Sequence, residues 1–245
     1  MQILVLSDIH GNLEALDAVL ADAPSGLTVW CLGDVVGYGP WPNECIERLR
    51  ELEPQCIVGN HDWAVMKKVN VEDFNPDARL SVLWTQEQLS NESSAYLESL
   101  PISLVEGPFT LVHGSPREPI WEYILYPPIA QLNFSYFGTP YCLVGHTHVP
   151  VLYRSRQEAD DPMCEMEQLR EGHPMPLEGG DRLIINPGSV GQPRDGDARA
   201  SYAILDTEAL TLEYRRVSYD IAKVQRRMEK AGLPQRNVMR LTYGW

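Results

Sequence analysis

The sequence has no long apolar run. No stretch approaches the about 18 consecutive apolar residues that a membrane-spanning helix needs, so we expect no membrane span. Residues 1–6 are mostly apolar, but the chain turns polar at Ser7 and Asp8. It therefore lacks the basic start, longer apolar core and small-residue cleavage site of a secretory signal. These absences predict a cytoplasmic protein without a membrane partner.

Paired cysteines are also missing. The five cysteines form no CxxC pair, and their odd number does not suggest a disulfide framework. Cys31, Cys56 and Cys142 lie inside apolar, strand-like runs, where a free thiol acts as a small hydrophobic side chain. A reducing compartment is the simplest interpretation.

Positive charge is scarce. The chain has 20 basic and 34 acidic residues, which gives a formal net charge of −14. A surface this negative repels nucleic acids and anionic membranes, so we expect no binding of either by bulk electrostatics. A local cationic site remains open, and bound metal ions are one way to supply it.

The first sixty residues alternate between strand-like and helix-like segments. Residues 2–7 form a continuous apolar run, which is typical of a strand covered on both faces. Asn12 is placed to cap the helix that follows. The predicted elements are a strand at 2–7, a helix at 12–22, a strand at 28–32, a helix at 42–52 and a strand at 56–58. This order indicates an α/β domain with parallel strands.

The rest of the chain is richer in strands. We predict helices at 76–100 and 220–230, and strands at 102–106, 109–112, 141–144, 149–153, 183–185, 202–206 and 211–217. No Gly/Ser- or Pro-rich linker and no internal repeat divides the sequence, so residues 1–245 are expected to form a single domain. An acidic segment at about 154–182 is predicted to be a mobile excursion between two strands.

Five of the six histidines fall in short motifs where predicted strands end. The motifs are Asp8-Ile9-His10, Gly33-Asp34, Gly59-Asn60-His61-Asp62, Val112-His113-Gly114 and Gly145-His146-Thr147-His148. Ligands of open α/β sheets gather at the carboxyl ends of strands, so these side chains should meet at one edge. Taken singly, each motif has a structural alternative, such as a turn, a helix entry or a satisfied buried histidine. Five together favour a metal site.

The spacing of the motifs fits this interpretation. Because strand side chains alternate, Asp8 and His10 should point the same way, as should His146 and His148. Imidazole, carboxylate and amide ligands together suit Mn²⁺, Fe²⁺ or Zn²⁺ and suit Ca²⁺ or Mg²⁺ poorly. A carboxylate such as Asp34 can bridge two ions roughly 3.5–4 Å apart, as in two-metal hydrolases.

In this order the motifs resemble those of the calcineurin-like metallophosphoesterase superfamily, over about residues 8–199. The resemblance implies a four-layer αββα sandwich, in which two mixed β-sheets pack face to face and are flanked by helices. It implies that one metal is held by Asp8, His10 and His148, and the other by Asn60, His113 and His146, with Asp34 bridging. It also implies that His61 is the catalytic histidine and that Asp62 orients it.

The chemistry gives these residues their roles. A hydroxide that bridges two cations is a nucleophile near neutral pH, because the metals lower the pKa of bound water. The same cations stabilise the growing charge on the phosphoryl oxygens. A protonated His61 would neutralise that charge or protonate the leaving alkoxide, which is typically worth about 10²–10⁴-fold.

One departure narrows the choice of subfamily. Protein serine/threonine phosphatases and dinucleoside-tetraphosphate hydrolases of this superfamily carry an arginine shortly after the Gly-Asp motif, whereas residues 33–40 contain none. In this respect, and in residues 186–194, the sequence looks more like the small prokaryotic phosphodiesterases. Candidate substrate-binding residues are Arg117, Arg194 and Arg199, each with a surface role as the alternative. Tyr38, Trp41 and Trp121 are candidates for an apolar wall beside the leaving group, or for core residues.

The sequence therefore predicts a hydrolase that cleaves a small phosphodiester with two divalent metal ions. Mn²⁺ is the preferred identity of these ions, with Fe²⁺ or Zn²⁺ as alternatives. A phosphomonoesterase or protein phosphatase with the same site is the first alternative. A metal-binding scaffold without catalysis is the second, although a scaffold has no need for His61 or for a full ligand set. Nothing in the sequence specifies an oligomeric state.

Overall fold

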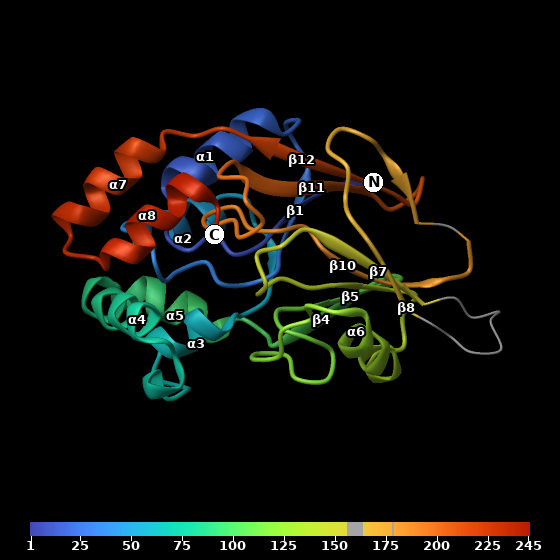
Figure 1. The fold of residues 1–245 in the computed structure, drawn as a ribbon, viewed down its shortest axis with the longest axis horizontal. Coiled ribbons are helices and arrows are strands. Elements are labelled where there is room, and N and C mark those ends of the chain that lie inside the picture. The colour runs from blue at the N-terminus through green and yellow to red at the C-terminus, as the bar shows by residue number, and fades with distance from the viewer. Residues whose placement is uncertain (156–163, 178) are drawn as a thin grey trace.

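Two six-stranded mixed sheets lie at the centre of the computed structural model, which describes residues 1–155, 164–177 and 179–245 (Figure 1). The first sheet has the order β3-β2-β1-β11-β12-β9. Its strands are β1 (Gln2–Leu6), β2 (Thr28–Cys31), β3 (Gln55–Cys56), β9 (Met175–Pro176), β11 (Ala200–Asp206) and β12 (Thr211–Val217). Strands β1, β2 and β3 are parallel, as predicted, and β11 runs antiparallel to β1.

The second sheet has the order β4-β5-β6-β10-β7-β8. Its strands are β4 (Ser103–Glu106), β5 (Phe109–Val112), β6 (Tyr141–Leu143), β7 (Val151–Ser155), β8 (Cys164–Glu167) and β10 (Arg182–Asn186). Strands β5, β6 and β10 are parallel to one another, whereas β4, β7 and β8 pair antiparallel. Each sheet thus has three neighbouring parallel strands whose carboxyl ends can carry a site.

The sheets pack against each other through one apolar layer. Ile3 and Val5 of β1 lie in this layer with Leu111 of β5 and Ile185 of β10. The alternate β1 residue Leu4 faces a second cluster on the helical side of the sheet. Both faces of β1 are therefore buried, which explains its uninterrupted apolar sequence.

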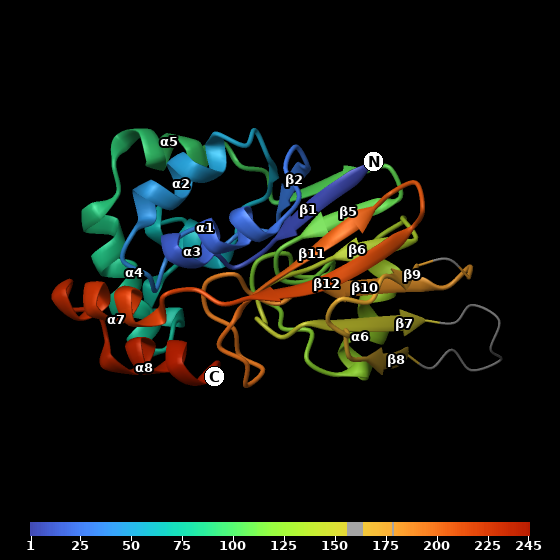
Figure 2. The same cartoon turned by 90° about the horizontal axis from the view of Figure 1, so that it is seen from above.

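Helices cover the outer faces of both sheets (Figures 1 and 2). They are α1 (Leu13–Asp22), α2 (Pro42–Arg50), α3 (Asn60–Val65), α4 (Pro76–Gln88), α5 (Asn91–Ser99), α6 (Pro127–Asn133), α7 (Ile221–Lys230) and α8 (Gln235–Tyr243), with 3₁₀ turns η1 (Val71–Asp73) and η2 (Phe134–Tyr136). Cysteine Cys142 packs with α6 in a further cluster, where it lies buried as a free thiol. The predicted αββα arrangement of two mixed sheets between helices is confirmed.

The structure differs from the local predictions in two places and adds detail in a third. The helix predicted at 76–100 is two helices, because Ser90 accepts a hydrogen bond from the Ser93 amide and starts α5. Helix α8 was not predicted. The segment at about 154–182, predicted to be a mobile excursion, lies between β7 and β10, and within it Cys164–Glu167 form β8 and Met175–Pro176 form β9, which extend one sheet each. Residues 156–163 and 178 of that segment lie outside the described residues.

No helix in the described part of the chain is both long and apolar enough to cross a membrane.

Candidate metal centre

The five histidine and aspartate motifs meet where the parallel strands of both sheets end. Asp8 and His10 follow β1, Asp34 follows β2, and His113 follows β5. Asn60 and His61 open α3 directly after β3, and His146 and His148 follow β6. Backbone hydrogen bonds join loops within each sheet, for example Asp8 N to Gly33 O at 3.0 Å and Gly145 N to His113 O at 2.8 Å. Between the sheets, His146 N donates to Asp8 Oδ2 at 3.1 Å. The two sheets thus supply one shared edge.

The predicted ligands form three overlapping groups. Within each group, one ligand atom from every residue lies within 4.8 Å of those of the others. The groups are Asp8 with His10 and His148, His10 with Asp34 and His61, and Asp34 with His113 and His146. Every one of these side chains is buried. The structure therefore brings all the predicted His and Asp ligands together.

Asp34 lies between the outer groups. Its Oδ2 atom is 3.6 Å from His10 Nε2 and 3.3 Å from His113 Nε2. Asn60 Oδ1 also lies 3.1 Å from this His113 Nε2 atom. In the first group, Asp8 Oδ1 is 3.3 Å from His148 Nε2. The carboxylate predicted to bridge two ions occupies the position between their two ligand sets.

The backbone of the cluster is unusual. Asp8, His10 and Asp34 have φ angles of 53°, 50° and 53°, and His146 and His148 have φ angles of 66° and 60°. This left-handed region is disfavoured for residues other than glycine, and such strain gathers at functional sites. The strands end before these residues, so strand alternation is the wrong explanation for their convergence. The turned backbone aims the side chains inward instead.

Two glycines allow the close approach of these loops. A Cβ atom on Gly59 would lie 2.0 Å from Asp34 Oδ1, and one on Gly145 would lie 2.1 Å from Ser7 Oγ. Real Cβ contacts are never this short, so both positions require glycine.

Backbone carbonyls fix the orientation of three imidazoles. The Nδ1 atom donates to Val36 O in His10 (3.1 Å), to Leu32 O in His113 (2.7 Å) and to Gln192 O in His148 (2.6 Å). A carbonyl only accepts, so Nδ1 carries the hydrogen and Nε2 faces the cluster. This arrangement is typical of histidines that bind a metal through Nε2.

The donor set fits metal cations. His10 Nε2 and His148 Nε2 lie 3.0 Å apart, and since both Nδ1 atoms donate elsewhere, two lone pairs face each other. Burial lowers the pKa of both histidines, so a shared proton is disfavoured there. A cation would satisfy both nitrogens and the Asp8 carboxylate beside them.

The charges of the group formed by Asp34, His113 and His146 also favour a bound cation. Burial lowers the pKa of His113, but Asp34 and Asp8 outweigh it and raise the pKa to about 10. Burial raises the pKa of Asp34, yet His113 and His61 bring it well below the usual range. For His146, burial and the nearby His113 lower the pKa to about 3. A buried carboxylate surrounded by imidazoles favours a bound cation. Without one, a proton on His113 supplies part of the positive charge that the carboxylate needs.

His61 is buried among aromatic rings. Its centroid lies 4.4 Å from that of Tyr38 and 5.0 Å from that of Phe74. Its Nδ1 atom is buried and has no hydrogen-bond partner among the described residues. Burial, followed by the charge of Arg194 among the lowering causes, brings the pKa of His61 to about 4.

Asp62 does not contact the ring of His61 through any hydrogen bond, which corrects the predicted orienting role. Its carboxylate accepts hydrogen bonds from the backbone amides of Gly59 (3.0 Å), Asp34 (2.8 Å) and Val36 (3.1 Å). Burial and the charge of Asp34 raise its pKa to about 7. Asp62 positions the loop that carries Asp34, and the Asp34 carboxylate in turn accepts from the His61 amide at 2.8 Å.

The structure distinguishes the three candidate arginines. Arg117 is paired with Glu122, and Arg199 is paired with Asp197 and Glu171. These carboxylates occupy both guanidinium groups, so neither is placed for a phosphate.

Arg194 differs, because its Nη2 atom donates to the Tyr38 hydroxyl at 3.2 Å and to Gln192 Oε1 at 2.8 Å. In the described part of the chain, no carboxylate lies within ion-pair distance of it.

The three predicted aromatic residues lie in different surroundings. Tyr38 lies against the centre, 4.7 Å from the His10 ring, whereas Trp41 packs in the helical apolar clusters. The Trp121 carbonyl lies 3.2 Å from His146 Nε2. The sequence analysis missed Tyr123, whose ring stacks on His146 at 3.8 Å, and Phe74. Neither stands in a recognisable motif, so no signal in the sequence pointed to them.

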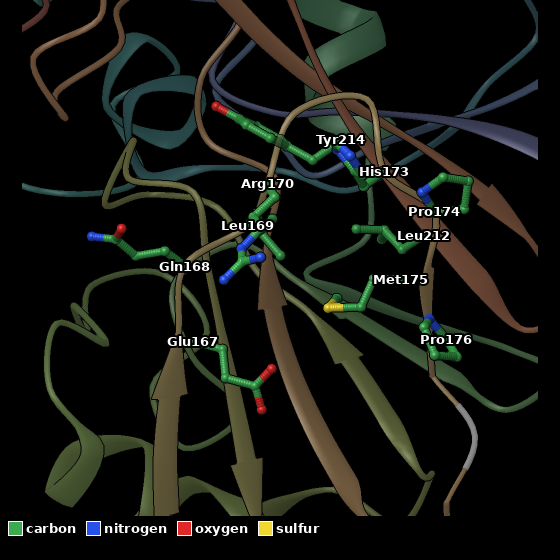
Figure 3. A pocket seen from close by; sticks show the side chains of 10 residues that line it. All are labelled: Glu167, Gln168, Leu169, Arg170, His173, Pro174, Met175, Pro176, Leu212 and Tyr214. Atoms are coloured by element: carbon green, nitrogen blue, oxygen red, sulfur yellow. The ribbon is translucent and has the colours of Figure 1, made fainter.

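A separate cavity lies away from this centre. It measures about 650 Å³ and is lined by residues of β8, β9 and β12 and the loop between β8 and β9, among them Arg170, Met175 and Tyr214 (Figure 3). None of the predicted ligands lines it. The candidate site thus rests on its buried polar cluster and not on cavity size.

Comparisons with known proteins agree with the geometry. The family model described as the calcineurin-like phosphoesterase superfamily domain matches residues 1–210. A crystal structure of a metallophosphoesterase from Sphaerobacter thermophilus is 49% identical, covers 100% of both chains and has a TM-score of 0.90.

Two further relatives extend over nearly the whole chain. An uncharacterized protein from Methanocaldococcus jannaschii is 41% identical over 240 residues, which are 95% of this chain and 94% of that protein. A hypothetical protein from Pyrococcus horikoshii OT3 is 24% identical, with 100% and 98% of the two chains covered and a TM-score of 0.77. The second likeness concerns the fold alone.

Proposed function

Since the chain belongs to the calcineurin-like phosphoesterase superfamily, we propose that it hydrolyses a phosphodiester with two divalent cations. The observation that carries the proposal is the buried cluster in which Asp34 lies between His10 and His113. The metallophosphoesterase from Sphaerobacter thermophilus, 49% identical over its full length, supports the same class of reaction.

The proposed ligand sets follow the groups in the cluster. Asp8, His10 and His148 would hold the first ion, and Asn60, His113 and His146 would hold the second, with Asp34 between the two sets. A site rich in imidazole favours Mn²⁺, with Fe²⁺ and Zn²⁺ as alternatives. When bound, two such cations supply positive charge to the phosphoryl oxygens and lower the pKa of water into the neutral range.

The remaining chemistry belongs to two side chains of the protein. Arg194 donates hydrogen bonds to the phosphoryl oxygens from its place beside Tyr38. His61 supplies a proton to the leaving oxygen. Its pKa of about 4 is low because burial and the charge of Arg194 disfavour the protonated ring. A bound phosphate brings negative charge to the same place and raises that pKa, so protonation accompanies substrate binding.

The role of Arg194 can be tested directly. Arg194→Gln should lower kcat/KM by about 10- to 100-fold, because a hydrogen bond to a charged group contributes about 1.5–3 kcal/mol. Arg199→Gln is the matched control, since its guanidinium is already paired with Asp197 and Glu171. Steady-state kinetics of both variants decide the matter. Equal losses in the two would remove Arg194 from the substrate site.

The substrate class is the second test. We expect bis(p-nitrophenyl) phosphate to be hydrolysed with a higher kcat/KM than p-nitrophenyl phosphate. A diester carries one negative charge, and Arg194 is the one guanidinium that is bonded to Tyr38 beside His61 in the described residues. Tyr38, Phe74 and Tyr123 offer an apolar surface for the second substituent.

Both substrates should be compared under one metal and at one pH. A clear preference for the monoester would replace the proposal with a phosphomonoesterase. Turnover of neither substrate by protein shown to contain two metals would favour a scaffold.

A further inference from the structure

Residues 113–126 join β5 to α6 and begin with the predicted ligand His113 (Figure 1). The structure describes this β5–α6 segment in full and places neither a helix nor a strand in it. Its course therefore depends on contacts other than the regular hydrogen bonds of helices and sheets.

The β5–α6 segment holds the ring of His146 at two points. The Trp121 carbonyl lies 3.2 Å from His146 Nε2, and because a carbonyl only accepts, Nε2 donates and Nδ1 keeps the lone pair. The ring of Tyr123 stacks on the same imidazole, with the centroids 3.8 Å apart and an angle of 28° between the planes. The direction in which His146 presents a nitrogen to a metal thus depends on where Trp121 and Tyr123 lie.

Glu122 lies between these two residues in the chain, and its carboxylate is a centre of hydrogen bonds. Its Oε2 atom accepts from Ser115 Oγ at 2.7 Å, from Asn133 Nδ2 at 2.8 Å and from Arg117 Nε at 3.3 Å. Arg117 Nη2 donates to Oε1 as well. Burial raises the pKa of Glu122, but the bonds from Arg117, Asn133 and Ser115 outweigh it and lower the pKa. The carboxylate is therefore ionised at neutral pH, and bonds to a charged acceptor are the stronger kind.

These bonds join parts of the chain that the segment itself does not hold together. Ser115 lies two residues after His113, the other imidazole proposed for the second ion. Asn133 is the last residue of α6, where it is fully buried, and its Oδ1 atom accepts from the Arg117 amide at 3.0 Å. Glu122 therefore connects the end of β5 and the end of α6 to the two residues that contact His146.

The imidazoles proposed for the first ion are held by other loops. His10 Nδ1 donates to Val36 O at 3.1 Å, and His148 Nδ1 donates to Gln192 O at 2.6 Å. Neither carbonyl belongs to the β5–α6 segment. A change at Glu122 should therefore affect the two ions unequally.

We propose that Glu122 is a positioning residue for the second metal ion, because it fixes the segment that holds Trp121 and Tyr123 against His146. Glu122 is not itself a ligand. This inference rests on the proposed function in one respect, since it takes His146 as a ligand of the second ion.

Mn²⁺ binding by Glu122→Ala tests the inference. Metal-free wild-type protein is titrated calorimetrically with Mn²⁺ and should bind two ions. The variant should bind one ion with wild-type affinity and the other about 10- to 100-fold more weakly, as expected when the support of a metal-binding histidine is lost. Electron paramagnetic resonance gives a second readout. Two Mn²⁺ ions roughly 3.5–4 Å apart couple magnetically, whereas a single ion in the variant gives an uncoupled signal.

Two further variants serve as controls. Glu171→Ala also removes a carboxylate from an arginine, Arg199, but neither residue belongs to the ligand groups, so this variant should bind both ions as the wild type does. Glu122→Gln keeps one acceptor oxygen without the charge and should show the same selective loss at a smaller size. Thermal unfolding of the metal-free samples checks the fold, and Glu122→Gln provides the test if Glu122→Ala does not fold.

The inference is overturned if the folded Glu122 variant binds both ions with wild-type affinity, or if it weakens both ions equally. Hydrolysis of bis(p-nitrophenyl) phosphate by the wild type is measured separately. A wild-type protein that binds two Mn²⁺ ions and cleaves no diester overturns the proposed activity, whereas the Mn²⁺ titrations still decide the role of Glu122. A wild-type protein that binds fewer than two ions contradicts both.

Discussion

Exhaustive chelation should abolish hydrolysis, and Mn²⁺ should restore it more fully than Mg²⁺. The cations are expected to provide several kcal/mol of transition-state stabilisation, so their removal should lower kcat by about a thousandfold or more. Mn²⁺ is favoured because His10, His113 and His148 all present Nε2 to the cluster, and Mg²⁺ binds imidazole poorly. Elemental analysis and kinetics on the same preparation provide the measurement.

Metal removal should also lower the Tm. Without cations, Asp8 and Asp34 remain buried as charges, and the lone pairs of His10 and His148 face each other at 3.0 Å. Ions that bind the folded chain alone stabilise it by mass action. A sample dialysed without chelator is the control. Full activity in a preparation shown to be free of metal would contradict the two-metal assignment.

The meeting of the candidate ligands at one edge was predictable, because it depends on motifs and on the order of strands. Each motif follows a strand, and parallel strands end at a common edge. The means of convergence was not predictable in the same way. Asp8 and His10 were expected to share a face through strand alternation, but both lie beyond the strand with positive φ. Backbone strain of this kind leaves no mark in a sequence, since it is maintained by contacts from distant loops.

The partners of the three candidate arginines could not be predicted from the sequence either. Arg117, Arg194 and Arg199 look alike in the sequence, and only their surroundings separate them. Arg117 is paired with Glu122, and Arg199 is paired with Glu171. Arg194 instead donates to Tyr38, which is 156 residues away along the chain. Pairings of this kind are set by tertiary structure.

Asp62 shows a related limit on reasoning from motifs. The resemblance to the superfamily implied that Asp62 orients His61. Because it is the third residue of α3, its carboxylate turns back to the amide of Gly59 instead. The helix start decided the direction of the side chain, and the motif alone did not reveal where that helix begins.

His61→Ala should lower kcat by about 10²–10⁴-fold, the range expected for a positioned acid, and should leave about two metals per chain. His61 Nδ1 has no partner among the described residues, which suits a group that meets the substrate. The structure also places His61 in one group with His10 and Asp34, so ligation of a metal by His61 is the alternative. Metal content measured together with kcat separates the two roles.

Asp34→Ala provides the comparison that makes this test decisive. Asp34 Oδ2 faces His10 at 3.6 Å and His113 at 3.3 Å, so loss of this carboxylate should weaken both ion sites at once. The variant should therefore lose metal and activity together, and excess Mn²⁺ should recover only part of either. For His61→Ala, added Mn²⁺ should recover nothing, because the missing group is an acid. If the His61 variant loses metal while the Asp34 variant keeps both ions, the roles assigned to these two residues are reversed.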